Sequence, residues 1–258
     1  MFKKFIDSVQ RRLSKSTYFV LLLCKLRNQI NRIISYHFSQ DHLIEESGES
    51  FLIDQYNDQL KVVFDVGANK GEWSEYLLSK SNNLKKLVLI EPSKNTFNYL
   101  VEKFIDNQKI ELHQVGLSNV TGTFNFFAEE NMGETSSFIA NNASANATIE
   151  KVNVTTLDVL CNDLQISHID FLKIDCEGYD LKVLQGAENL IKQKAIQFIQ
   201  FEYNHDWLSA GATLKYAIDF LTNYGYKVYL INNNGLSSYD YETFGDFFGF
   251  CNFFATID

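Results

Sequence analysis

A short apolar segment that runs into a glycine turn constrains the fold of this chain more than any other feature. Residues 62–73 read Val-Val-Phe-Asp-Val-Gly-Ala-Asn-Lys-Gly-Glu-Trp, which predicts a buried strand, a tight turn and the start of a helix. Gly67 and Gly71 let the backbone of such a turn approach a ligand, and the helix start offers unpaired N–H groups. The Gly-x-x-x-Gly spacing is neither that of dinucleotide sites nor that of the Walker loop. We therefore expect an α/β fold with a ligand at this turn, where a side chain at position 67 would block binding while the domain still folds.

A carboxylate follows the next apolar segment. Residues 87–90 read Leu-Val-Leu-Ile and end at Glu91-Pro92, about 20 residues beyond the glycine turn. At the tip of a second strand, Glu91 is placed to accept hydrogen bonds from the two hydroxyls of a ribose. The turn and the carboxylate together predict a cofactor that contains a nucleoside. A glycine turn alone can be purely structural in an α/β protein, so the spacing of Glu91 is the stronger signal.

Apolar segments alternate with helical stretches along the rest of the chain, which predicts a mostly parallel sheet. We expect strands at 62–66, 87–91, 110–115, 170–175, 197–203, 226–231 and 250–257, and helices near 72–80, 94–106, 180–193 and 212–224. Residues 121–127 are expected to form a β-hairpin arm. The loop at 131–148 that follows has few bulky apolar residues, and loops of this length inside a domain are usually lids or disordered segments.

Three motifs occur in a fixed order. They comprise residues 65–71 with Glu91-Pro92, residues 154–158, and residues 170–178 with the helix segment 183–187 behind them. In this order they resemble the motifs of the FkbM family of S-adenosylmethionine-dependent methyltransferases, and the resemblance covers residues 51–258. Two departures are small: Cys176 stands where the family often has Val, and Tyr179-Asp180 replaces a more usual Ala-Glu.

The resemblance implies a doubly wound, mostly parallel seven-stranded sheet of the class I methyltransferase type. It also implies S-adenosylmethionine as the cofactor and methyl transfer to a hydroxyl, most often on a sugar of a surface polysaccharide or on a small natural product. A nicotinamide-dependent oxidoreductase would also use a glycine turn and Glu91, but Ala68-Asn69 breaks the spacing it needs. A third alternative is a non-enzymatic scaffold, although the glycine turn and Glu91 are both intact.

Candidate cofactor contacts follow from the strand ends, because ligands of such folds bind outside the C-terminal ends of the strands. The candidates are Asp65, Gly67, Asn69, Gly71, Glu91, Pro92, Gly116, Leu117 and Asp175. We expect the turn with Asn69 at the methionine portion, Glu91 at the ribose and the pair 116–117 at the adenine ring. Asp175 would face the methionine amine or the reaction centre. Asp65 could instead only cap the turn, since Asp bonds nearby backbone N–H groups readily.

Candidate catalytic residues are Glu177, Glu202 and His205, which come at or just beyond strand ends. Strand-tip acids in a cleft often have perturbed pKa values, and a histidine titrates in the range that a general base needs. Glu177 begins a helix, where a carboxylate can be merely structural, and a lone loop histidine is more often a surface residue. With Asp175 these side chains could hold a divalent cation, but nothing local fixes the geometry that Mg²⁺ demands, so no metal is predicted.

Charge divides the chain into two parts. Residues 1–40 contain eight Lys or Arg and one Asp, a net charge of +7, and because the whole chain carries −9 the remainder carries −16. An acidic body is a poor partner for nucleic acid, whose phosphates require a basic surface. The four cysteines are scattered, which indicates reduced thiols in a cytoplasmic protein.

Residues 1–50 are expected to form a basic amphipathic helical extension, and residues 51–258 the methyltransferase domain. Apolar residues recur at helical spacing in the extension, but its longest apolar run, residues 18–24, is far shorter than the ~20 residues that span a bilayer. Residues 1–40 could pack on the domain, form a dimer contact or lie on an anionic membrane surface, the last at the inner face of the membrane.

Overall fold

The structure is a computed structural model that describes residues 2–38, 47–129, 136–140, 146–233 and 235–257. Its central sheet is built from β1 (Val62–Val66), β2 (Lys86–Ile90), β3 (Ile110–His113), β7 (Ile169–Ile174), β8 (Ile196–Tyr203), β9 (Lys227–Asn232), β10 (Gly235–Ser238) and β11 (Cys251–Thr256). The strands follow the order β10-β9-β11-β8-β7-β1-β2-β3 across the sheet.

The five strands from β3 to β8 in this order are mutually parallel, and β11 runs antiparallel between β8 and β9. The predicted class of fold is therefore confirmed. One strand of this sheet was not predicted: β10 adds an eighth, antiparallel strand at the edge. Every residue of β7 is buried, as expected of a central parallel strand that is covered on both faces.

Helices cover both faces of the sheet. They are α3 (Glu49–Tyr56), the 3₁₀ turn η1 (Asn57–Gln59), α4 (Glu72–Lys80), α5 (Lys94–Lys103), α6 (Leu157–Asp163), α7 (Asp180–Gly186), α8 (Glu188–Lys192), α9 (Asp206–Ser209), α10 (Leu214–Asn223) and α11 (Tyr241–Phe244). Alternate residues of β1 enter two separate cores, with Val63 facing α3, α4 and α5 and Phe64 facing α6, α7, α8 and α10. The predicted helix at 180–193 is broken at Ala187 into α7 and α8.

A smaller sheet stands beside the main one at the strand ends. It contains β4 (Gly116–Leu117), β5 (Gly122–Ala128) and β6 (Thr148–Thr155) in the order β4-β6-β5. β5 and β6 pair antiparallel, which agrees with the predicted hairpin arm. Of the loop predicted as a lid, only residues 136–140 and 146–148 are described, and the rest lies outside the described residues.

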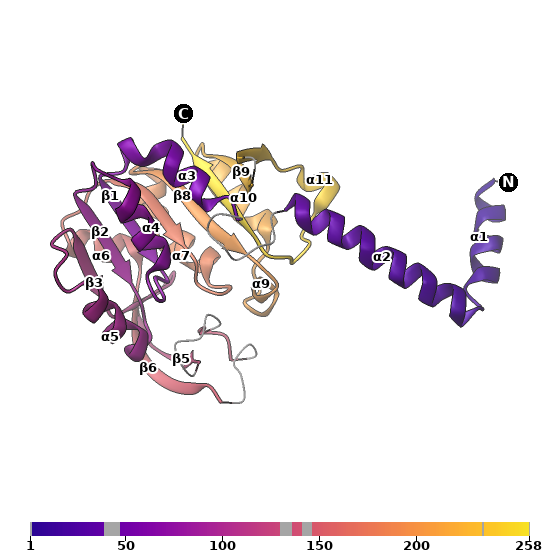
Figure 1. The fold of residues 1–258 in the computed structure, drawn as a ribbon, viewed down its shortest axis with the longest axis horizontal. Helices are drawn as coiled ribbons and strands as arrows, with labels where there is room; N and C mark the ends of the chain where they lie inside the picture. Colours follow the sequence, from indigo (N-terminus) through magenta and orange to yellow (C-terminus); the bar gives the residue numbers. More distant parts are fainter. Residues whose placement is uncertain (1, 39–46, 130–135, 141–145, 234, 258) are drawn as a thin grey trace.

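Two helices, α1 (Phe2–Leu13) and α2 (Thr17–His37), project from the body as an arm (Figure 1). The arm meets the body at Phe38, which is buried and stacks on Phe247 with ring centroids 4.3 Å apart. None of the helices in the described part of the chain is both long enough and apolar enough to cross a membrane. The division expected at residue 50 stays a prediction, and residues 47–49 already pack on the body.

Candidate active site

An open cleft lies along the C-terminal ends of β1, β2, β7 and β8. Val66 is in register with Ile90 and Ile174, and Ile174 is in register with Phe201, so β1, β2 and β7 end at one level and β8 continues from it to Tyr203. The residues that follow these positions line the cleft: Gly67, Glu91, Asp175 and Glu202. Counted out to the solvent, the cleft has an empty volume of about 1310 Å³.

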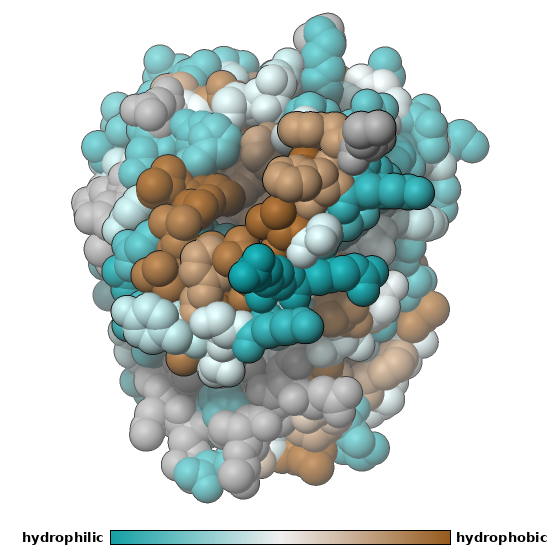
Figure 2. Space-filling model, turned by 90° about the vertical axis from the view of Figure 1, so that its right-hand side faces the viewer, coloured by the Kyte–Doolittle hydropathy of each residue, from teal (hydrophilic) through white to brown (hydrophobic). Residues whose placement is uncertain are grey.

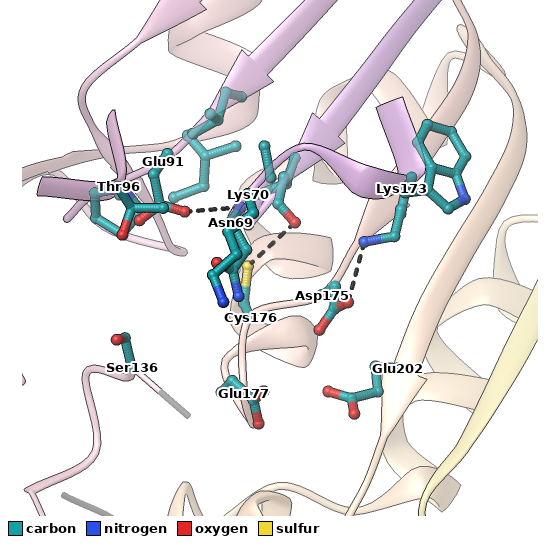
Figure 3. Close-up of a pocket in the computed structure, with 18 of the residues that line it drawn as sticks. Asn69, Lys70, Glu91, Thr96, Ser136, Lys173, Asp175, Cys176, Glu177 and Glu202 are labelled. Atoms are coloured by element: carbon teal, nitrogen blue, oxygen red, sulfur yellow. Dashed lines mark hydrogen bonds and ion pairs between the residues drawn. The ribbon is translucent and has the colours of Figure 1, made fainter. Parts of the chain in front are cut away.

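Nine of the twelve predicted site residues line this cleft. They are Gly67, Asn69, Glu91, Pro92, Gly116, Leu117, Asp175, Glu177 and Glu202. The other three, Asp65, Gly71 and His205, lie elsewhere, for reasons given below. In Figure 3, Glu91 and Asn69 lie at one end of the cleft, apart from Glu177 and Glu202.

Glu91 is held at the tip of β2 by backbone N–H groups. It is 5% exposed, and its two oxygens accept the N–H of Asn69 at 3.0 Å and the N–H of Ser93 at 2.9 Å. Burial raises the pKa of Glu91 to about 7, although the two N–H bonds act in the opposite direction. Each carboxylate oxygen keeps a further lone pair, so the ionised group can still accept hydrogen bonds from a ligand.

The turn after β1 presents a polar group to the cleft. Asn69 has a φ of 45°, in the left-handed region that Asn tolerates better than most residues. Its buried Oδ1 has no hydrogen-bond partner among the described residues, which is a vacant acceptor at the cleft wall. A buried acceptor without a partner costs stability and points to a ligand that supplies the missing donor.

The two glycines of the turn are required for reasons that differ from the prediction. A Cβ on Gly67 would overlap the backbone carbonyl oxygen of Asp175, so the missing side chain lets the ends of β1 and β7 approach each other. A Cβ on Gly71 would press against Phe104 and Leu100, away from the cleft. The expectation that a side chain at Gly67 would block only the ligand is therefore wrong, because the fold itself needs the space.

Lys173 forms the electrostatic centre beneath the cleft. Its side chain is 6% exposed, and its Nζ lies 3.0 Å from Asp175 (Figure 3). The same Nζ lies 3.5 Å from Asp65. Burial alone would lower the pKa of Lys173, but the charges of Asp175, Asp65 and Glu49 raise it above its ordinary value. Asp65 is fully buried and also accepts the hydroxyl of Ser74 at 2.6 Å, so it supports the turn from below and does not line the cleft.

Glu49 is a cleft residue that sequence reasoning missed. It begins α3, is 8% exposed, and accepts hydrogen bonds from the Ser47 hydroxyl at 3.1 Å and from the amide of Gln200. Burial raises the pKa of Glu49, whereas the nearby charge of Lys173 lowers it. Gln200 is 151 positions away along the chain, so no local motif could have identified this contact.

Asp175, Glu177 and Glu202 form a group of carboxylates at the other end of the cleft from Glu91. One oxygen of each lies within 4.8 Å of the others. Glu202 is 4% exposed, and burial together with the charges of Asp175 and Glu177 raises its pKa well above its ordinary value. The amide of Asn204 donates to Glu202 at 3.1 Å and to Glu177 at 3.4 Å, which fixes both side chains. Oxygens at this spacing can hold a divalent cation or a ligand hydroxyl.

Backbone conformation sets the position of Glu177. Its φ is 48°, a left-handed conformation that is uncommon for a residue other than Gly, Asn or Asp. Its carbonyl oxygen accepts the hydroxyl of Ser137 at 3.0 Å, from the loop between β5 and β6. A residue in such a strained conformation persists only where the surrounding structure holds it in place, and residues of this kind cluster at functional sites.

His205 does not reach the cleft. Its side chain is 82% exposed, and its Nε2 lies 3.0 Å from the buried carboxylate of the neighbouring Asp206. The residue lies just before α9, and the turn there directs its ring to solvent. The structure therefore gives no support to the prediction that His205 contacts an acceptor.

The described part of the loop between β5 and β6 contributes a wall of the cleft. Ser136 and Phe138 line it, and the Phe138 ring packs on Phe126 and Tyr179 with centroids 4.8 and 5.1 Å away. A Cβ on Gly116 would overlap the Phe138 ring, so the glycine allows the ring to lie against β4.

Replacing Lys173 with Met should destabilise the fold strongly. The change leaves the buried Asp65 carboxylate without its counter-charge, and breaking a buried ion pair on one side costs roughly 3–5 kcal/mol. Urea denaturation would measure the free energy of unfolding. Lys86→Met is the matched control, because Lys86 pairs with Glu111 at 2.8 Å near the surface and such pairs contribute roughly 0–1 kcal/mol. Equal losses in the two variants would contradict the central role of Lys173.

Gly67→Ala should cost more stability than Gly211→Ala. Both glycines have a left-handed φ, which penalises alanine by roughly 1–2 kcal/mol, but only at Gly67 would the new Cβ overlap backbone. At Gly211 nothing lies within 4 Å of the Cβ position. Thermal and urea unfolding of both variants checks the difference, and a Gly67→Ala variant no less stable than Gly211→Ala would show that the strand ends can move apart freely.

Comparison with known proteins identifies the family to which the chain belongs. The Methyltransferase FkbM domain matches residues 65–228. A solved structure of an FkbM methyltransferase from Methylobacillus flagellatus is similar over 76% of this chain, with 18% identity and a TM-score of 0.48, and the chain spans 44% of that protein's length. Precorrin-6y C5,15-methyltransferase from Geobacter metallireducens has 14% identity and a TM-score of 0.45 over 84% of this chain and 90% of its own.

A third solved structure, TrmK from M. capricolum in complex with S-adenosylhomocysteine, has 13% identity and a TM-score of 0.45 over 81% of this chain and 68% of its own. No curated protein matches the chain. The domain match covers more than half of the chain, and it includes the glycine turn, Glu91 and the three clustered carboxylates. The protein therefore belongs to the FkbM family of S-adenosylmethionine-dependent methyltransferases.

Proposed function

We propose that the protein transfers a methyl group to a hydroxyl of a glycan or of a small polyhydroxylated molecule. The observation that carries this proposal is the group formed by Asp175, Glu177 and Glu202, whose oxygens lie within 4.8 Å of one another in the cleft. Carboxylates are acceptors only, so they suit a ligand that brings several O–H donors. Phosphate-rich acceptors fit such a surface poorly, because like charges repel.

The residues at the Glu91 end of the cleft fit S-adenosylmethionine. Glu91 offers lone pairs to a ribose diol, the vacant Oδ1 of Asn69 offers an acceptor to an ammonium group, and Ile90 and Leu117 offer an apolar wall to a flat ring. The cofactor supplies an electrophilic methyl group on a positively charged sulfur. We assign Glu91, Asn69 and the pair 116–117 to cofactor binding on this basis, and the nicotinamide alternative is set aside with the family assignment.

The carboxylate group is proposed as the acceptor side. An alcohol is a weak nucleophile that must lose its proton in or near the transition state, and a positioned base assists that loss. Glu202 is the preferred base, because a carboxylate whose pKa is raised by burial and by neighbouring charges is more basic once ionised. Asn204 orients the side chain, and Glu177 is placed to hold a second hydroxyl of the acceptor. The acidic surroundings also favour a cationic sulfur near Asp175.

Binding of S-adenosylhomocysteine should weaken as the pH falls below about 7. Only the ionised Glu91 can offer both oxygens to the ribose, and burial raises the pKa of Glu91 to about 7, so the interaction is present above this pH and lost below it. Charge-assisted bonds contribute ~1.5–3 kcal/mol, or one to two decades in affinity. Titration calorimetry from about pH 5.5 to about pH 8.5 measures the effect.

Glu91→Gln should bind weakly at every pH in this range, whereas Glu111→Gln, on β3 and outside the cleft, should behave as the wild type. If the Gln variant at position 91 kept the wild-type affinity and pH dependence, the ribose assignment would be wrong.

Glu202→Gln should lower turnover by roughly 10²–10⁴-fold while leaving S-adenosylhomocysteine affinity unchanged, because a general base acts only in the transition state. The measurement is formation of S-adenosylhomocysteine with a panel of mono- and oligosaccharide acceptors. His205→Ala is the matched control and should retain activity, since its ring points to solvent. Full activity of the Glu202 variant would remove the base assignment, and activity lost on chelation and restored by Mg²⁺ would replace it with a cation at the same oxygens.

A further inference from the structure

The arm formed by α1 and α2 exposes apolar side chains along its whole length. Neither helix has a buried residue. Among the described residues, 15 of the 25 large apolar side chains that are exposed belong to the arm, including Phe2, Phe5 and Ile33 at 78%, 66% and 69%. Soluble proteins rarely leave so concentrated an apolar surface in water, so a partner is expected to cover it.

The apolar and basic residues of α1 occupy different sides of the helix. Phe2, Phe5, Val9 and Leu13 recur every three or four positions and therefore share one face. The cations Lys3, Lys4, Arg11 and Arg12 fall on the other face and at its margins. Figure 2 views the molecule from the side on which the arm projects and shows apolar and hydrophilic patches next to each other.

The positive charge of the arm favours a partner with a negatively charged surface. Residues 1–40 carry +7, and α2 contains no Asp or Glu. In α2, Phe19, Leu23, Leu26, Ile30 and Ile33 are spaced by four and three, which would also suit a coiled coil with a second copy. Two such arms side by side would, however, bring positive charge against positive charge with no acidic residue on either α2 to offset it.

We propose that the arm binds the surface of a membrane rich in anionic lipids. α1 lies in the plane of the interface with Phe2, Phe5 and Val9 among the upper acyl chains, and its cations contact the headgroups. Phe38 packs against Phe244 and Phe247 and fixes the base of the arm to the body. An arm bound to the membrane would therefore hold the catalytic body at the membrane surface. The cleft is not part of this surface, and the proposal is independent of the acceptor.

Sedimentation with vesicles tests the proposal on the full chain. Vesicles of phosphatidylcholine with about a third phosphatidylglycerol should bind the protein, with binding that weakens as salt rises from about 50 to about 200 mM, and vesicles of phosphatidylcholine alone should not. Replacing Lys3, Lys4, Arg11 and Arg12 with Gln should reduce binding roughly fivefold for each cation removed, more than 100-fold in all. Replacing Phe2, Phe5 and Val9 with Ser should abolish binding.

The matched control replaces four exposed lysines of the body with Gln, namely Lys85, Lys109, Lys151 and Lys192, and should bind as the wild type. S-adenosylhomocysteine binding, measured on every variant, should not change, because the arm is remote from the cleft and its side chains are exposed. Equal loss in the body control, or full binding by either arm variant, would overturn the proposal. A dimer in light scattering that the arm variants dissociate, without vesicle binding, would also overturn it and identify a second copy as the partner.

Discussion

The buried ammonium group of Lys173 is the interaction on which the rest of the site depends. It lies within ion-pair distance of Asp65 below the glycine turn and of Asp175 at the end of β7, and close enough to Glu49 at the start of α3 to alter its pKa. Carboxylates brought this close without a cation would repel one another and would take up protons. One lysine therefore joins β1, β7 and α3 and lets a strongly acidic cleft exist within a folded domain.

The register of β1, β2, β7 and β8 brings residues from four separate parts of the sequence together in one site. Val66, Ile90 and Ile174 end β1, β2 and β7, and pairing places them at one level with Phe201 of β8. The next residues along the chain, Gly67, Glu91, Asp175 and Glu202, all line the cleft. A shift of register by one residue in β2, β7 or β8 would turn its carboxylate toward the opposite face, so burial of the sheet and placement of the site are specified by the same pairing.

Much of this could be predicted from the sequence, because strands and their ends are local features. The strand at 62–66, the acid that ends the second strand and the pair Glu177 and Glu202 all follow from apolar runs with a polar residue behind them. The remaining features depend on contacts between distant positions. Glu49 reaches the cleft through a partner 151 positions away, and the orientation of His205 depends on the turn before α9. The break at Ala187 likewise arises in a segment whose apolar pattern is continuous.

The contact between Gly116 and Phe138 has a consequence for how wet the cleft is. The ring can lie against β4 only because position 116 has no side chain, and in that place it closes one wall of the cleft with an apolar surface. Any larger residue there would push the ring outward and admit water, which would raise the local dielectric constant and weaken the attraction between the carboxylates and a cationic ligand. Gly116 thus affects the electrostatics of the cleft through the ring that it accommodates, in addition to any contact of its own with the cofactor.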